Sequence, residues 1–261
     1  MKKIYKFLGL FCLTIFSFYY TEKIALIMQS KSSLMQEIVE NSEDNKTDSV
    51  SAIIVDNTII PGLNGLEVDK NSSFSKMKSL GVFNDYYLVY KEIKPEVSLE
   101  DNKDKIIIRG NKAKKSVSFI FKKENELTEY LKHNNIKANI LININNYIKS
   151  DYFELINNEV ENFDALERLL NTNNSNKNIC VLNKFNYDIC LKNNKYLVKP
   201  TNEVNNQSLI SYKRNIISGD ILLIDSNTSL ENLKLLLKEI QYHDLKIVTL
   251  SEIISENNNR E

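Results

Sequence analysis

The chain has 261 residues, enough for one large domain or two smaller ones, and its 42% hydrophobic and 26% charged content is ordinary for a globular protein. Lys and Arg together number 34, as do Asp and Glu, so the formal net charge is zero. A chain without excess positive charge has no bulk basic field for nucleic acid, and we expect no nucleic-acid partner.

Residues 1–22 are typical of a targeting or anchoring segment. Lys2, Lys3 and Lys6 precede an uncharged, mostly apolar run at residues 7–20. The run is short for a spanning helix, which needs about 20 apolar residues, yet no small-residue cleavage site follows it. We predict an uncleaved signal-anchor that leaves the rest of the chain outside the cell membrane; cleavage of the segment would make the protein secreted.

The next part of the chain is predicted to connect this segment to a folded body. Residues 23–50 have apolar positions at helical spacing and then the polar sequence NSEDNKTDS, which indicates a helical stalk and a linker. Residues 51–112 are β-rich, with two turn signals in IPGLNG. Because this extension offers no core of its own, we expect it to pack on the domain that follows. The elements expected in it are strands at 51–55, 86–90 and 105–109 and a helix at 74–80.

Residues 113–261 are predicted to form an α/β domain. Two stretches, residues 114–143 and 219–252, each contain a β-rich apolar run, an amphipathic helix and a second β-rich run, which is the pattern of a βαβ unit. The runs SVSFIF and ILLI supply the first strand of each unit. Strands that return parallel through a helix need both sheet faces covered, so these units indicate the core of an α/β fold.

The stretch between the two units gives weaker signals. We expect one or two helices within residues 147–170 and short strands at 179–182, 189–191, 196–198 and 208–212. Cys180 and Cys190 flank KFNYD, a candidate hairpin tip, so their side chains can meet. We favour two small, part-buried thiols over a disulfide, and the pairing stays open. No spacing typical of zinc-binding cysteines is present in the sequence.

Several segments resemble one protein family. The strand SVSFIF, the sequence IKANILIN after the first helix, and GDILLID and LKIVTLSEI in the second unit are similar to the polysaccharide deacetylases of carbohydrate esterase family four. The resemblance covers about residues 114–255. The stretch 53–110, which contains VDNTIIPGLNG, also resembles the N-terminal region of such proteins in low-GC bacteria. The resemblance implies an irregular (β/α) barrel with its site at the carboxyl ends of the strands.

The chemistry that the resemblance implies is incomplete in this chain. The family holds a metal with one Asp and two His and uses a second Asp as base. The positions that match the acidic pair carry Lys122 and Lys123, and an ammonium group has no lone pair for a metal. The histidine pair matches residues 157–166, which contain no histidine, and the family's late histidine matches Asp225. We therefore assign no metal ligand, no cofactor and no catalytic residue, with Asp225 as the single catalytic candidate.

The sequence thus predicts a deacetylase-like domain without catalysis, tethered outside the cell membrane, that binds a cell-wall polysaccharide or another envelope partner through the old substrate groove. Tyr147, Tyr152, Phe185 and Tyr187 are the candidate side chains for stacking on sugars. Two alternatives stay open. One is an active polysaccharide N-deacetylase with displaced ligands, and the other is a structural envelope protein without affinity for glycan.

Overall fold

The computed structural model describes residues 2–171, 178–208, 212 and 215–258. The chain divides into two compact units, which we describe separately: unit 1 comprises residues 1–48 and 65–93, and unit 2 comprises residues 49–64 and 94–261. The predicted β-rich extension, residues 51–112, is therefore shared between the two units.

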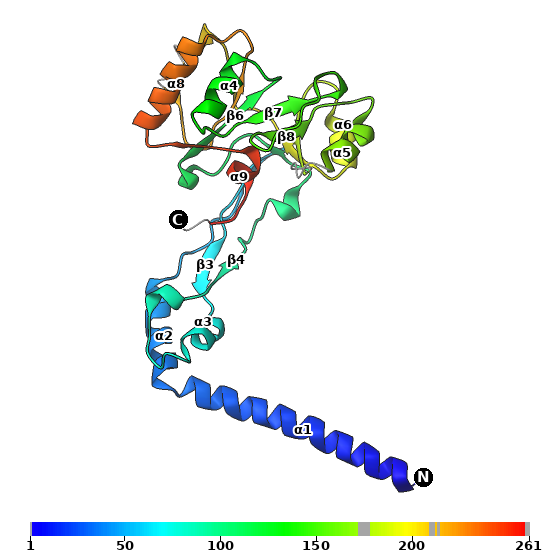
Figure 1. The fold of residues 1–261 in the computed structure, drawn as a ribbon, viewed down its shortest axis with the longest axis vertical. Helices are drawn as coiled ribbons and strands as arrows, with labels where there is room; N and C mark the ends of the chain where they lie inside the picture. The colour runs from blue at the N-terminus through cyan, green and yellow to red at the C-terminus, as the bar shows by residue number, and fades with distance from the viewer. Residues whose placement is uncertain (1, 172–177, 209–211, 213–214, 259–261) are drawn as a thin grey trace. The chain divides into compact units, whose positions relative to one another are not determined.

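Unit 1 combines helices with one small antiparallel sheet (Figure 1). Its elements are α1 (Lys2–Ser30), α2 (Ser33–Asp44), β3 (Gly65–Val68), α3 (Lys70–Met77), the 3-10 turn η1 (Asp85–Tyr87) and β4 (Tyr90–Ile93). Ser32 and Asp69 cap α2 and α3, because each side chain accepts a backbone amide of the first helical turn. The helix expected at 74–80 thus begins earlier, at the residue after its cap, and the strand expected at 86–90 begins only at Tyr90.

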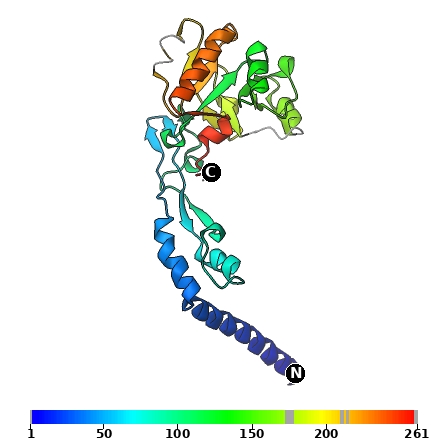
Figure 2. The ribbon, with the colours of Figure 1, turned by 60° about the vertical axis from the view of Figure 1, so that its left-hand side comes forward.

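Unit 1 has a small hydrophobic core of its own. Its buried side chains are Leu34, Met35, Ile38, Val68, Phe74, Met77 and Leu88, with Phe83 and Tyr90 packed against them. Figure 2 shows α2 and α3 beside the β3–β4 pair from a second side. The sequence predicts that the β-rich extension packs on the following domain, whereas residues 65–93 pack on α2. The physical reason is that α2 presents three apolar residues at helical spacing to this part of the chain.

α1 contains the one stretch, among the described residues, that is long and apolar enough to cross a membrane, Phe11–Ser30. Its 20 residues extend about 30 Å as a helix, which is the thickness of a bilayer's hydrocarbon core. None of this stretch is buried against the rest of the protein. The apolar helix therefore reaches past the predicted segment 1–22, and it is compatible with a membrane anchor or with a signal sequence.

Unit 2 is an α/β unit, as the sequence predicts. Its elements are β1 (Ile53–Val55), β2 (Thr58–Ile60), η2 (Glu100–Asn102), β5 (Ile106–Ile107), η3 (Lys112–Lys114), β6 (Ser116–Phe121), α4 (Glu126–His133), β7 (Asn139–Ile142), η4 (Ile144–Asn146), β8 (Glu154–Asn157), α5 (Phe163–Asn171), β9 (Ile179–Val181), α6 (Tyr187–Lys192), β10 (Tyr196–Val198), β11 (Asn202–Val204), β12 (Ile221–Ile224), α8 (Leu230–Tyr242), β13 (Lys246–Val248) and α9 (Leu250–Ile254).

The strands of unit 2 form two hydrogen-bonded sheets. The first has the order β11-β12-β6-β7-β8, with β13 also paired to β6, and all of its pairs are parallel. The second has the order β1-β2-β5-β10-β9, in which the β1–β2 hairpin is the antiparallel pair. Both predicted βαβ units, β6-α4-β7 and β12-α8-β13, lie in the first sheet. The prediction of an α/β fold built on these two units is confirmed.

Three local predictions between the two βαβ units are wrong or concern residues outside the described part of the chain. The segment expected as a strand at 189–191 lies in helix α6, and β8 is a strand within 147–170, where only helices are expected. The strand expected at 208–212 falls largely on residues 209–211, outside the described residues. Short apolar runs of this kind do not distinguish a strand from a helix by periodicity alone.

The two faces of the first sheet meet different partners, and β6 illustrates the division. Val117, Phe119 and Phe121 are buried in one core with apolar residues of α4, α5 and α8, and α4 and α8 lie side by side (Figure 1). Ile120, on the opposite face, belongs to a second core. This alternation is the period of two expected of a strand, and it places α4, α5 and α8 on a single face of this strand.

The second core joins the two sheets of unit 2. It contains side chains from β6, β7, β8 and β12 together with side chains from β2, β5, β9, β10 and α9. Asn139, fully buried on β7, donates to the Ser118 hydroxyl at 2.9 Å and accepts the backbone amide of Leu250 at 2.8 Å. Both sheets therefore enclose one interior, and a buried amide ties α9 to it.

A buried ion pair holds the amino ends of β6 and β12 to the chain that precedes them. Asp220 is 1% exposed, and its carboxylate lies 2.9 Å from the Arg109 guanidinium. The Tyr212 hydroxyl also donates to Asp220, and so does the backbone amide of Ile217, at 3.0 Å. Burial and the neighbouring carboxylate raise the pKa of Tyr212, which therefore stays protonated. These contacts hold the residue directly before β12 in place.

Cys180 and Cys190 form a disulfide, with their Cα atoms 6.0 Å apart. The preference for two free thiols is therefore wrong. The second half of the expected hairpin is helix α6, which packs on β10 and buries Cys190 beside Cys180 and Leu197.

Replacing both cysteines, Cys180→Ala with Cys190→Ala, is expected to lower the free energy of unfolding by about 2–3 kcal/mol, because a short cross-linked loop loses its constraint on the unfolded chain. Urea unfolding followed by circular dichroism measures this loss. Cys12→Ala, which removes the exposed free thiol, should leave the unfolding midpoint unchanged. An oxidised and a fully reduced wild-type protein that unfold at the same urea concentration would contradict the disulfide.

Candidate functional site

Parallel strands bring their carboxyl ends to one edge of a sheet, and this edge is where barrel and open α/β enzymes place their sites. We call the segments that follow β6, β7, β8, β9, β11 and β12 the carboxyl edge of unit 2. They are residues 122–125, 143–147, 158–160, 182–187, 205–206 and 225–228. All predicted site residues except Tyr152 lie in these segments.

Lys122 and Lys123 follow β6, and both are exposed at the carboxyl edge. The Lys122 ammonium lies 3.0 Å from the carboxylate of Glu203 on β11, and the Lys122 carbonyl accepts the side-chain amide of Asn146 at 3.0 Å. Lys122 therefore links the chain after β6 to β11 on one side and to the turn after β7 on the other. It acts as a cation that neutralises a carboxylate.

Asparagines and one glutamate continue this linkage along the edge. Asn143 and Asn146 form a reciprocal cap on the turn after β7. Within that turn, the backbone amide of Ile144 donates to the carboxylate of Glu159, which follows β8, at 3.1 Å. That backbone amide, together with those of neighbouring residues, lowers the pKa of Glu159, which stays ionised. Further along, Asn183 after β9 donates to Asn158 after β8 at 3.1 Å. Consecutive loops are thus hydrogen-bonded to one another.

Asp225 follows β12, and the register of β12 with β6 places it beside Lys122. It is partly buried, and its carboxylate accepts the backbone amide of Asn227 at 2.8 Å. Its backbone amide also donates to the carbonyl of Val204 at 2.9 Å. These contacts are those of an aspartate that shapes a turn.

The four aromatic candidates divide into two pairs. Tyr147 and Tyr152 are partly buried against the core beneath the helices, and burial raises the pKa of Tyr152. Phe185 and Tyr187, after β9, are 80% and 36% exposed. Only the second pair offers open aromatic surface, and the Asn183–Asn158 bond places that pair next to the loop after β8.

The residues of the carboxyl edge do not fit the metal that the family resemblance implies. A divalent ion needs several converging donors, and the described part of the chain holds no group of three or more His, Cys, Asp or Glu side chains so arranged. His133 ends α4 and His243 follows α8 as its C-cap, so both lie at helix ends outside the carboxyl edge. No catalytic step through a metal follows from this donor set.

The asparagine-rich linkage is the part of the site that sequence reasoning missed. Its signal is present, because an Asn occurs within the first few residues after β6, β7, β8, β9 and β11. The Asn and Lys content is high throughout the chain, so this recurrence does not stand out until the strands are aligned. Most of these side-chain amides form hydrogen bonds within their own loops, as caps of helical turns or within tight turns.

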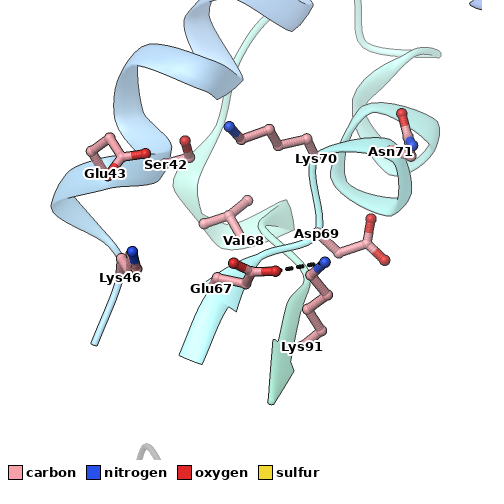
Figure 3. Close-up of a pocket in the computed structure, with 9 residues that line it drawn as sticks. All are labelled: Ser42, Glu43, Lys46, Glu67, Val68, Asp69, Lys70, Asn71 and Lys91. Atoms are coloured by element: carbon pink, nitrogen blue, oxygen red, sulfur yellow. Dashed lines mark ion pairs between the residues drawn. The ribbon is translucent and has the colours of Figure 1, made fainter. Parts of the chain in front are cut away.

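Unit 1 has a pocket of its own, about 330 Å³ in volume, between α2, β3, β4 and the start of α3 (Figure 3). The Glu67 carboxylate pairs with Lys91 at 2.6 Å, and Lys70 extends toward Ser42. The hydrogen bond from Lys91 lowers the pKa of Glu67. The charged lining consists of Glu43, Glu67, Asp69, Lys46, Lys70 and Lys91. Three carboxylates and three ammonium groups balance, so the pocket favours neither a cation nor an anion.

Comparison with known proteins identifies the fold. No family model matches the chain. The crystal structure of wild-type BA3943, a CE4 family pseudoenzyme from Bacillus anthracis, matches with a TM-score of 0.57 at 19% identity, over 87% of this chain and 96% of that one. A mutant of BA3943 with restored enzymatic activity matches with a TM-score of 0.58 at 20% identity, over 87% and 99% of the two chains.

This chain has the fold of a CE4 deacetylase-like protein. The CE4-like α/β fold expected from the family resemblance is thereby confirmed. Over 96 residues the chain is also 35% identical to the uncharacterised protein YlxY of Bacillus subtilis. That match covers 36% of this chain and 30% of YlxY, so it spans under a third of the curated relative's length. The carboxyl edge of unit 2, where the sequence resemblance predicts a site, carries Lys122.

Proposed function

We propose that this protein is a membrane-tethered, extracytoplasmic CE4-type pseudoenzyme that binds a cell-envelope glycan at the carboxyl edge of unit 2. The observation that carries the proposal is the Lys122–Glu203 ion pair at the end of β6. In CE4 deacetylases an acidic pair is expected at this position to hold a metal and activate water. Here the position supplies a cation that is already neutralised.

Three features support a location outside the cytoplasm. α1 carries an apolar stretch of spanning length, and lysines precede that stretch in the sequence. A lysine-rich end is retained on the cytoplasmic side of the membrane. The Cys180–Cys190 disulfide in unit 2 fits an oxidising compartment. We therefore infer that α1 anchors the protein and that the rest of unit 1 and all of unit 2 lie outside.

Glycan binding is supported by the kind of surface at the carboxyl edge. Aromatic rings bind the apolar faces of sugars, and side-chain amides and carboxylates bond to their hydroxyl groups. Phe185 is the most exposed ring there, and Asn183 lies two residues before it. The loops are hydrogen-bonded to each other, so the surface is preorganised before a ligand binds.

The test uses the full-length protein in detergent micelles, with peptidoglycan and soluble N-acetylated oligosaccharides as ligands. Phe185→Ala is expected to weaken sedimentation with peptidoglycan by about tenfold, since an aromatic contact contributes roughly 1–1.5 kcal/mol. Tyr242→Ala is the matched control, because that ring is 83% exposed on α8, outside the carboxyl edge, and binding should not change.

Acetate release is measured on the same substrates with added zinc. We expect none above a blank without protein. Acetate release that depends on the protein would support an active deacetylase with displaced ligands and would contradict the pseudoenzyme. Unchanged binding in Phe185→Ala would remove the carboxyl edge as the glycan surface. A protein that binds no glycan would favour a purely structural envelope role.

A further inference from the structure

An exposed apolar segment of unit 1 has no role in the proposed glycan site. We call residues 80–87, between α3 and β4, the docking loop. Leu80, Val82, Tyr86 and Tyr87 are 48%, 63%, 96% and 42% exposed. Four large apolar or aromatic side chains open to solvent within eight residues are unusual on a soluble surface, and such patches mark interaction sites.

The docking loop is fixed close to the end of the apolar helix. Phe83, in the middle of the loop, packs against the unit 1 core that contains Leu34 and Met35 of the first turn of α2. These residues follow the end of the apolar stretch at Ser30 by four and five positions, across the two-residue break between α1 and α2. A second link joins α3 to α1, because Gln29 donates to Asn71 at 3.1 Å.

These links hold the first turns of α2 and α3 beside the end of the apolar helix, and the docking loop follows the last turn of α3. A bilayer's interfacial zone extends about 5–8 Å beyond the hydrocarbon core on each side. If Phe11–Ser30 spans the core, the first turns of α2 and α3 lie in that zone. Tyrosine is enriched at this depth because its ring is apolar and its hydroxyl group can bond to water. Lys76 and Lys78, both exposed just before the loop, add charge that suits anionic lipids.

We propose that the docking loop inserts Leu80, Val82 and Tyr86 into the interface of the membrane that α1 spans, so that unit 1 lies on the lipid surface. The occupant is the lipid bilayer, with anionic headgroups near Lys76 and Lys78. This inference rests on the membrane tether of the proposed function and is independent of glycan binding. It gives unit 1 two membrane contacts, the span and the loop.

The chain contains no tryptophan, so one introduced Trp reports a single position. Val82→Trp is placed in the full-length chain, which is reconstituted into vesicles of phosphatidylethanolamine and phosphatidylglycerol. We expect its emission to be blue-shifted and to be quenched by brominated lipids at least about twofold more than that of Tyr242→Trp, the matched exposed position on α8 of unit 2. Adding Lys76→Glu and Lys78→Glu is expected to reduce the quenching.

Three outcomes would overturn the proposal. Val82→Trp emission as red-shifted and as weakly quenched as that of Tyr242→Trp would show a loop in water. A blue shift without lipid quenching would indicate cover by protein, such as a second copy. A chain that an alkaline carbonate wash removes from the vesicles would refute the tether itself. The first two outcomes, with the chain retained after the wash, contradict the docking loop and leave the tether intact.

Discussion

Replacing Asp220 by Ala is expected to destabilise unit 2 by about 3–5 kcal/mol, because it leaves the positive charge of the Arg109 guanidinium without its carboxylate partner. Asp220 is 1% exposed and receives contacts from Arg109, Tyr212 and Ile217. Hydrogen exchange of the backbone amides of β6 and β12 measures the effect, since these strands are paired with each other directly after this cluster. This readout reports unit 2 and is independent of unit 1.

Glu203→Gln is the matched control for the ion pair at the other end of the same sheet. Glu203 and Lys122 are each 53% exposed, so their pair lies in water and is expected to contribute less than about 1 kcal/mol. Exchange rates in Asp220→Ala that rise no further than those in Glu203→Gln would contradict the assignment of Asp220 as a stabilising buried charge.

Gly219→Ala is expected to lower the free energy of unfolding by roughly 2–4 kcal/mol. Gly219 has a φ of +93°, where side chains are strained, and a Cβ would lie 2.3 Å from the carbonyl oxygen of Gly110. A backbone oxygen cannot turn away as a side chain can. The segment after Arg109 and the segment before β12 must therefore separate, which also disturbs the Arg109–Asp220 pair.

Gly81→Ala separates backbone strain from steric contact. Gly81 has a φ of +70°, but no atom lies within 4 Å of the position that its Cβ would occupy. Only the cost of the left-handed conformation remains, about 1–2 kcal/mol, and it is measured by amide exchange in α3. Equal losses in Gly81→Ala and Gly219→Ala would show that the close approach to Gly110 contributes nothing.

The sequence predicts the elements of unit 2 best where their patterns are long. The run SVSFIF corresponds to β6, and the helical spacing of Leu230, Leu233, Leu237 and Ile240 corresponds to the core-facing side of α8, where Leu233 and Ile240 are buried and the other two are partly buried. β8 and α6, each of six residues or fewer, lack a pattern long enough to distinguish helix from strand. The sequence also places Lys122 and Lys123 directly after β6, where the structure has them.

The partners of these residues could not be predicted. Lys122 meets Glu203, which is 81 positions away, and Asp220 meets Arg109 across the start of β6. The β-rich extension also divides between two units, although its sequence contains no break that marks the division. Such contacts depend on how parallel strands and crossover helices pack, and no local spacing encodes them.

The sequence by itself determined that the chain has an apolar N-terminal helix, two βαβ units and lysines where the family resemblance implies an acidic pair. The helix and the βαβ units follow from composition and period, which are local properties of the chain, and the place of the lysines follows from the family resemblance. The tertiary structure alone decided that Lys122 is neutralised by Glu203, that Cys180 pairs with Cys190, and that residues 65–93 form a core with α2. Each of these depends on which distant segments pack together, because burial and ion pairing are properties of the folded chain.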